Sequence, residues 1–126
     1  MYSATLMDHF THPRNVGRLD PHDASGTSGT PGNGPFVEFT VRLADERVVA
    51  VGFQTFGCGP AIAASSLLTE LVAGRRLSDT ASLTAEALVA ALGGLPEDKR
   101  YCAELAVAAW RDLLARTSSA TPEQPI

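Results

Sequence analysis

Cysteine is scarce in this chain, which has only Cys58 and Cys102, and no apolar run approaches the length of a membrane helix. Such a helix needs about 18 consecutive apolar residues, so a membrane-spanning protein is not expected. A disulfide scaffold is not expected either, because 126 residues can bury a core without one. The N-terminus has no basic cluster followed by an apolar segment. We therefore expect a cytoplasmic protein whose thiols are free or bind metal.

Positive charge is also sparse, since ten Lys and Arg against fourteen Asp and Glu give a net charge of −4. No basic stripe with interleaved aromatic residues is present, so nucleic-acid binding is not expected. The pair Ser65-Ser66 lacks the G-x-S-x-G motif of a serine nucleophile, and no histidine lies beside either cysteine in the sequence. These absences predict a protein that is not an enzyme.

The patterns that are present predict one domain in which a helix, a hairpin and further helices follow each other. Ser3 can cap a first helix that ends near His12, ahead of Pro13. Further helices are predicted at about 60–73, at 84–92 with Thr84 as its cap, and from Pro96 to about residue 116. Strict alternation predicts two antiparallel strands whose inward side chains are Val37, Phe39, Val41 and Leu43, then Val49, Val51 and Phe53.

This order of elements is typical of the α+β class, with a small antiparallel sheet and helices packed on one face. Residues 23–35 contain four glycines and two prolines and almost nothing apolar, so we expect a mobile loop there. Residues 118–126 are expected to form a disordered tail, which leaves 1–117 as a single domain.

Cys58 lies between two glycines, just before the predicted helix that Pro60 opens. The unpaired N–H groups and the dipole of a helix N-terminus favour a thiolate, and flanking glycines allow a bulky group to approach. This pattern suits a metal or cluster ligand. A tight turn that simply requires small residues explains the sequence equally well.

Cys102 shares one face of the last predicted helix with apolar residues, so spacing alone makes it a core residue. It becomes a ligand candidate only if Cys58 lies near it in space. His9, His12 and His22 form no metal-spaced pair with a cysteine, and we expect them to be solvated, although His9 and Asp8 also suit a docking surface.

Four segments together resemble the NifU/IscU-type iron-sulfur cluster assembly scaffolds. They are MDHFTHPRNVGRLD, GTPGNG, GFQTFGCGPAIAASSLLTEL and LPEDKRYCAELA. The likeness extends over about residues 2–115, and its core phrase, Phe-x-x-x-Gly-Cys-x-x-Ala-Ile-Ala-x-Ser-Ser from Phe53, is long and unusual. The resemblance implies a SufE/NifU-like fold and a role in building or carrying iron-sulfur clusters.

The resemblance also implies that Cys58 and Cys102 are the metal-binding residues, with Lys99 at the family's basic position. Asn33 and Tyr101 would line the site or meet a partner, because they replace the family's first cysteine and its frequent histidine. The family's Cys-Gly-Asp reads Asn33-Gly34-Pro35 here. A [2Fe-2S] cluster takes about four ligands, so we expect iron or a cluster only when two subunits share it. Zinc is not expected, because its ligand set is incomplete.

Two chemistries remain open for such a scaffold or carrier. Two chains can pool their thiolates in a homodimer, or Cys102 can accept a persulfide with Cys58 poised beside it. A function of another class also remains open. The protein can be a degenerate family member that lost metal binding and acts as a partner-binding or regulatory module.

The partners implied by the resemblance are those of the family. A cysteine desulfurase is expected, because the arm that meets it in relatives matches well here, at Asp8, His9, Pro13, Arg14, Asn15, Val16 and Gly17. The chaperone loop resembles Leu95-Pro96-x-x-Lys99, but its interior residues are Glu97 and Asp98. This acidic pair argues against recognition by an Hsp70-type chaperone.

Overall fold

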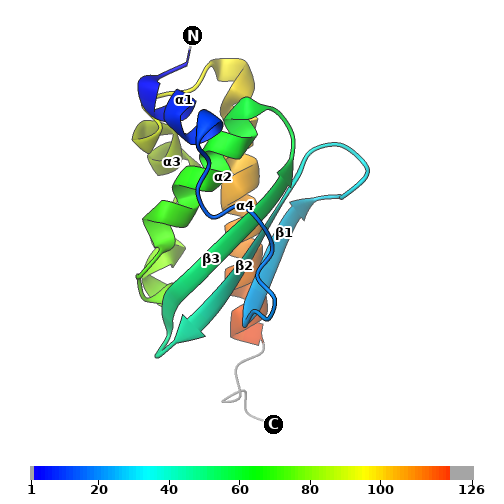
Figure 1. The fold of residues 1–126 in the computed structure, drawn as a ribbon, viewed down its shortest axis with the longest axis vertical. Helices are drawn as coiled ribbons and strands as arrows, with labels where there is room; N and C mark the ends of the chain where they lie inside the picture. The colour runs from blue at the N-terminus through cyan, green and yellow to red at the C-terminus, as the bar shows by residue number, and fades with distance from the viewer. Residues whose placement is uncertain (1, 120–126) are drawn as a thin grey trace.

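A computed structural model of the chain describes residues 2–119. Three strands form one antiparallel sheet in the order β1-β2-β3, and α2 and α4 lie side by side on one of its faces (Figure 1). This arrangement confirms the predicted α+β class. The elements are α1 (Ala4–Thr11), β1 (Ala24–Gly29), β2 (Phe36–Ala44), β3 (Arg47–Phe56), α2 (Gly59–Val72), the 3-10 helix η1 (Leu77–Ser82), α3 (Ala85–Ala91), the 3-10 turn η2 (Glu97–Lys99) and α4 (Arg100–Ser119).

The predicted starts of the first three helices are confirmed, because each depends on a local signal. The Ser3 side chain accepts a hydrogen bond from the backbone N–H of Leu6, and the Thr84 side chain accepts one from Ala87. A side-chain oxygen at this position satisfies one of the free N–H groups of the first turn. The last helix differs from the prediction in detail, since Pro96 opens the short turn η2 and α4 begins at Arg100.

The mobile loop predicted for residues 23–35 is wrong for its first half, because Ala24–Gly29 form the edge strand β1. Its small residues are explained by α4, which packs directly against it. A Cβ on Gly26 would lie 2.2 Å from the backbone nitrogen of Leu113, so only glycine fits. The strand therefore lacks the apolar alternation by which strands are recognised in sequence. Residues 30–35 form the turn into β2.

The predicted inward position of Val49 is also wrong. A register irregularity between Arg42 and Leu43 shifts the pairing of β2 with β3, so that Leu43 pairs with Val48. Val48 is consequently fully buried, whereas Val49 is 61% exposed. A bulge of this kind changes which side chains of a strand face the core, and simple alternation does not reveal it.

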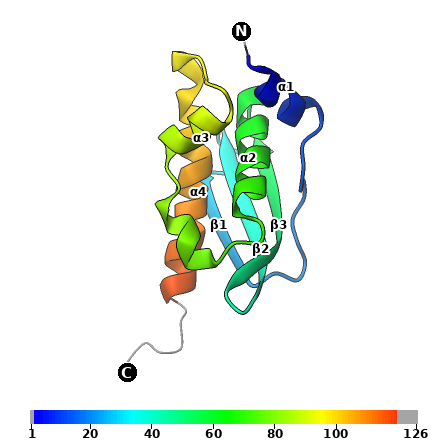
Figure 2. The ribbon, with the colours of Figure 1, turned by 90° about the vertical axis from the view of Figure 1, so that its left-hand side faces the viewer.

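The segment between α1 and β1 runs along β3 and covers part of the sheet away from the helices (Figure 2). Phe53 donates its backbone N–H to the carbonyl of Asn15 and accepts a hydrogen bond from Gly17. Strand alternation places the side chain of Thr40 on the sheet face away from the helices. It is nevertheless buried, and its hydroxyl accepts the backbone N–H of Leu19 from the covering segment. The segment thereby pairs with an otherwise free strand edge.

The core lies between the sheet and the helices. The rings of Phe39 and Trp110 meet edge to face with their centroids 5.7 Å apart, and the Trp110 indole N–H donates to Thr80 in η1. No helix within residues 2–119 is both long and apolar enough to cross a membrane. Most of the predicted tail, residues 120–126, falls outside the described residues, while 118 and 119 continue α4.

Candidate functional site

Cys58 and Cys102 come together although they lie 44 positions apart in the sequence, with their sulfur atoms 3.5 Å apart. Cys58 is the N-cap residue of α2, and Cys102 lies in the first turn of α4. The two helices pack side by side and begin at the same end of the molecule (Figure 1). Two thiols and two helix N-termini therefore meet at one place. The positive end of each helix dipole stabilises negative charge there.

The surroundings of Cys58 favour its thiolate. Partial burial works against ionisation, but the backbone N–H of Ala61, the Tyr101 hydroxyl, the Cys102 thiol and the charge of Lys99 together lower the pKa of Cys58. The backbone N–H of Ala61 stabilises the negative charge of the Cys58 thiolate, although the sulfur does not form a regular capping hydrogen bond. Cys58 is thus a partly exposed thiol that ionises more readily than an ordinary cysteine.

Cys102 behaves in the opposite way. Its side chain is fully buried, and this burial, together with the adjacent Cys58, raises the pKa of Cys102 to about 12. The Tyr101 hydroxyl lies 3.7 Å from the Cys58 sulfur, and that hydrogen bond raises the pKa of Tyr101 to about 12. The site therefore holds one accessible sulfur that ionises readily, one buried sulfur that keeps its proton, and a phenol that can donate.

Of the other residues singled out in the sequence, Lys99 lies in η2 directly before α4, and its charge favours the ionised form of both cysteines. Asn33 lies in the exposed turn between β1 and β2. This turn is at the same end of the sheet as Cys58, because Phe36, which follows it, pairs with Phe56. Within residues 2–119 the Asn33 side chain has no hydrogen bond to either cysteine.

The donor set of one chain falls short of a complete metal site. In the part of the chain that the structure describes, no three His, Cys, Asp or Glu side chains gather where they could hold a metal ion. Two soft sulfur ligands at contact distance suit iron, but a [2Fe-2S] cluster takes about four ligands. The arrangement can supply half of a cluster site, or it can perform thiol chemistry by itself.

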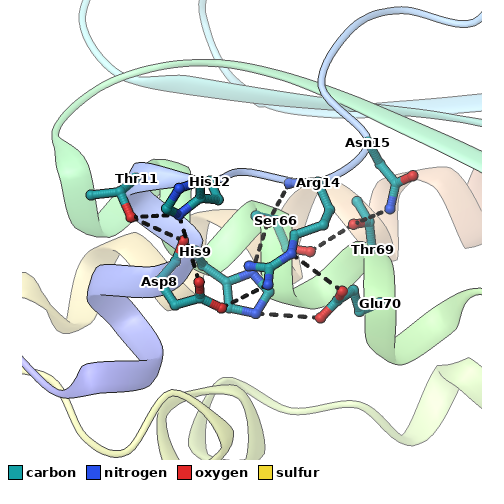
Figure 3. A network of polar contacts seen from close by, with 9 residues as sticks. All are labelled: Asp8, His9, Thr11, His12, Arg14, Asn15, Ser66, Thr69 and Glu70. Atoms are coloured by element: carbon teal, nitrogen blue, oxygen red, sulfur yellow. Dashed lines mark hydrogen bonds and ion pairs between the residues drawn. The ribbon is translucent and has the colours of Figure 1, made fainter.

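A polar network fixes the N-terminal arm against α2 (Figure 3). Ser66 joins the imidazole Nδ1 of His9 at 2.7 Å and accepts the backbone N–H of Arg14 at 2.9 Å. Glu70 lies 3.3 Å from the Nε2 of His9 and 3.6 Å from the guanidinium of Arg14. His9 is 4% exposed, so the prediction that it is a solvated residue is wrong.

The sequence patterns did not predict this network, because its members are distant in the sequence and nothing in the sequence pairs them. Ser66 read as an ordinary mid-helix serine, and nothing within a few positions of His9 indicates that it is buried. The signal that was present is the density of hydrogen-bonding side chains in the short arm from Asp8 to Asn15. The network holds α1 so that the ring of Phe10 packs against Gly59, beside Cys58.

Comparison with known proteins agrees with this fold. The family described as "NifU-like N terminal domain" matches residues 1–117. The iron-sulfur cluster assembly scaffold protein IscU 1 of Archaeoglobus fulgidus is 42% identical, over 88% of this chain and 72% of its own. IscU of Aquifex aeolicus is 42% identical over 82% of this chain and 68% of its own. The nitrogen fixation protein NifU of Azotobacter chroococcum is 35% identical over 97% of this chain, which corresponds to 42% of that protein.

Solved structures agree at the level of the fold. The N-terminal part of a nitrogen-fixing NifU-like protein from Brucella abortus superposes with a TM-score of 0.68 at 13% identity, over 94% of this chain and 95% of that one. A scaffold protein described for the SUF system of Fervidobacterium islandicum gives a TM-score of 0.66 at 16% identity, over 90% and 94%. The two IscU relatives are named as scaffold proteins. By sequence and by fold, this chain belongs to the NifU/IscU family of iron-sulfur cluster assembly scaffold proteins.

Proposed function

We propose that this protein is an iron-sulfur cluster assembly scaffold or carrier that holds iron, a [2Fe-2S] cluster or sulfur through Cys58 and Cys102. The observation that carries the proposal is the 3.5 Å separation of the two sulfur atoms at the shared N-terminal end of α2 and α4. Iron bound by sulfur is a soft-ligand site, and the positive ends of two helices stabilise the negative charge of its thiolates.

The proposed cluster is shared between two chains. One chain contributes two thiolates, and about four ligands are required, so two copies that bring their cysteine pairs together complete the set. Lys99 offsets the charge of the assembled site, and Asn33 and Tyr101 border it without supplying thiolate ligands. Zinc is not the proposed cargo, because no third or fourth donor joins the cysteines within residues 2–119.

We infer that the sulfur comes from a cysteine desulfurase, and that the protein transfers the cluster rather than catalysing a reaction on a substrate. Support comes from the arm residues that resemble the docking arm of the family, and from the network that holds this arm beside Cys58. The cytoplasmic location remains a prediction from the sequence.

The test is anaerobic reconstitution. Protein purified without oxygen is incubated with ferrous iron, cysteine and a cysteine desulfurase, and iron, acid-labile sulfide and visible absorption are measured after desalting. We expect about one [2Fe-2S] cluster per two chains, together with a doubling of the mass in solution when the cluster is loaded.

Three variants sharpen the result. Cys58→Ser and Cys102→Ser should each abolish the retained cluster, because either change leaves a dimer with two thiolates. Tyr101→Phe is the matched control, since it removes an oxygen beside the sulfurs and leaves both thiols in place. Wild-type protein that retains no iron under these conditions would contradict the scaffold role and support the docking or regulatory role instead.

A further inference from the structure

Asn33 is followed by a glycine in the exposed turn between β1 and β2, residues 30–35. The backbone N–H of Asn33 closes this turn by donating to the carbonyl of Thr30, and Gly34 has a φ angle of +93°. Asparagine is a chemically labile residue. Its side-chain amide is lost most easily before a glycine, because a residue without a Cβ leaves its backbone nitrogen unscreened.

Both reacting groups of the Asn33-Gly34 pair are free. Within residues 2–119, neither the Asn33 side chain nor the Gly34 backbone N–H forms a hydrogen bond. In the same part of the chain, a Cβ built on Gly34 would meet no atom within 4 Å beyond its chain neighbours. The pair is therefore open to water, which is the other reactant in the loss of an amide.

Asn15, the other asparagine of the chain, has opposite surroundings. Its side-chain amide donates to the hydroxyl of Thr69 at 2.9 Å, and its backbone carbonyl accepts the N–H of Phe53. The residue that follows it is Val16, whose branched side chain crowds the backbone nitrogen. Asn15 is thus fixed in place and provides an internal control in the same molecule.

We propose that Asn33 loses its side-chain amide spontaneously in the folded protein, and that the resulting carboxylate gives the thiol end a third metal-binding group. The thiol end is the end of the molecule at which Cys58 and Cys102 meet. The inference rests on the proposed function in so far as it concerns metal binding at the same end.

The fold brings residue 33 to the thiol end. Asn33 lies three residues before Phe36, Cys58 lies two residues after Phe56, and the two phenylalanines pair across β2 and β3. Within residues 2–119 no third His, Cys, Asp or Glu joins the thiols to hold a metal ion. A carboxylate at residue 33 supplies a donor of the missing kind, since three protein ligands and a water molecule form a complete tetrahedral set.

In the first step the backbone nitrogen of Gly34 attacks the side-chain carbonyl carbon of Asn33. A bond forms between these two atoms, and the bond from that carbon to the amide nitrogen breaks. The proton of the Gly34 N–H passes through water to the departing nitrogen, which leaves as ammonia. The product is a cyclic succinimide.

In the second step water opens this ring at one of its two carbonyl carbons. Attack at the side-chain carbon restores the Gly34 N–H and leaves aspartate at position 33. Attack at the backbone carbonyl carbon leaves isoaspartate, in which the main chain runs through the former side chain. No electrons are transferred, and either product carries a free carboxylate and one added negative charge.

The first experiment follows the amides in folded wild-type protein that is kept without metal at mildly alkaline pH for several days. Peptide mass spectrometry and enzymatic methylation of isoaspartate should show loss of most of the Asn33 amide, while the Asn15 amide stays intact. Circular dichroism checks that the chain remains folded. Asn33→Gln should stay unmodified, because its longer side chain must form a larger ring. Equal conversion of Asn33 and Asn15, or conversion of neither, would overturn the proposal.

The second experiment titrates Co²⁺ into reduced, iron-free Asn33→Asp and Asn33→Gln without oxygen. Thiolate ligation of Co²⁺ is detected by its charge-transfer absorption. We expect about one Co²⁺ per chain, bound about tenfold or more tightly by Asn33→Asp than by Asn33→Gln. Equal affinities of the two variants would show that a carboxylate at position 33 is not a third donor, and the proposal would be wrong.

Two further variants separate ligation from charge. Thr30→Asp adds the same charge in the same turn and should bind Co²⁺ as weakly as Asn33→Gln does. Cys58→Ser in the Asn33→Asp background should remove the gain, because the carboxylate then lacks one of its sulfur partners. A gain that appears in Thr30→Asp, or that survives Cys58→Ser, would overturn the third-donor role.

The absence of iron, sulfide and desulfurase separates this inference from the proposed function. A protein that builds a cluster but keeps the Asn33 amide would overturn the inference and leave the scaffold role intact. A protein that loses this amide and gains affinity for Co²⁺, but retains no cluster after reconstitution, would contradict the scaffold role alone.

Discussion

Two adjacent serines in α2 have opposite environments although both are fully buried. The Ser66 hydroxyl joins His9 and the backbone N–H of Arg14, which come from the N-terminal arm. The Ser65 hydroxyl has no hydrogen-bond partner in the described part of the chain. A buried hydroxyl without a partner loses its hydration and gains nothing in exchange, whereas a satisfied one stabilises the fold.

Alanine at these two positions should therefore have effects of opposite sign. Ser66→Ala should lower the free energy of unfolding by about 1–3 kcal/mol, because it leaves the Arg14 N–H and a ring nitrogen of His9 without their partner. Ser65→Ala should raise it by about 0.5 kcal/mol or more, since alanine is also the better helix former. Urea unfolding followed by circular dichroism measures both. Equal losses from the two variants would show that the Ser65 hydroxyl is satisfied in solution.

At the scale of elements, β1 depends on one glycine for its contact with α4. A Cβ on Gly26 would lie 2.5 Å from the carbonyl oxygen of Ala109 as well as 2.2 Å from the Leu113 nitrogen. Backbone atoms in a helix cannot move aside as a flexible side chain can. Further contacts tie β1 to the same helix, since Asp112 accepts the backbone N–H of Thr27 and the Ser28 hydroxyl donates to the Leu105 carbonyl.

Gly26→Ala should accordingly lower the free energy of unfolding by about 1–3 kcal/mol or more, through forced separation of β1 from α4. Ser25→Ala, the neighbouring position in the same strand, is the control and should change it by less than about 0.5 kcal/mol. Thermal and urea unfolding report the difference. If both variants were equally stable, the close packing of β1 on α4 would not exist in solution.

The attachment of α1 to α2 should depend on pH through His9. Burial and the nearby Arg14 charge lower the pKa of His9 below its ordinary value of 6.5, and the opposing charges of Glu70 and Asp8 do not compensate. The unfolded chain thus binds the proton more readily than the folded one. The stabilising effect of the neutral imidazole is complete above pH about 6.5 and decreases as the pH falls through that value.

His9→Gln should flatten the decline in unfolding free energy between about pH 7.5 and pH 5.5, by at most about 1.4 kcal/mol per pH unit. His12→Gln changes an exposed histidine in the same arm and should leave the decline as it is in the wild type. Urea unfolding at several pH values gives both curves. An unchanged slope in His9→Gln would mean that protonation of His9 is not coupled to folding.

At the scale of the whole molecule, apolar side chains are exposed around the thiol end. Phe56, Phe10 and Tyr101 are exposed by 66%, 41% and 43%, and all three lie next to Cys58 in the sequence or in space. Exposed aromatic residues beside a reactive group are typical of a surface that a partner covers. In the function proposed above, this is the surface that the cysteine desulfurase would cover.

Phe56→Ser should weaken binding of a cysteine desulfurase from the source organism about tenfold or more, measured by titration calorimetry. Val49→Ser is a matched control, because Val49 is exposed to a similar extent, 61%, near the opposite end of β3. The control should bind as the wild type does, and both variants should keep the wild-type melting temperature. Equal weakening by the two changes would place the docking surface elsewhere.

The elements that sequence patterns predicted are those whose signals act over a few residues. Ser3 and Thr84 cap helices because each side chain reaches an N–H three positions further on. The family resemblance likewise rests on four segments of contiguous residues, of which the phrase around Cys58 is the core. In contrast, β1 was predicted to be a loop. Its residues are small because they pack against α4, which lies more than 70 positions away in the chain.

By itself, then, the sequence determined the α+β class, the starts of α1, α2 and α3, the family and the candidacy of Cys58. Only the tertiary structure decided that Cys102 touches Cys58, that Cys58 stays partly exposed beside it, and that His9 lies inside rather than in solvent. The physical reason is that caps and periodicity are local, whereas burial and sulfur-sulfur contact depend on how α2 and α4 pack side by side. That packing brings two cysteines that are distant in the sequence into contact, one buried and one partly exposed.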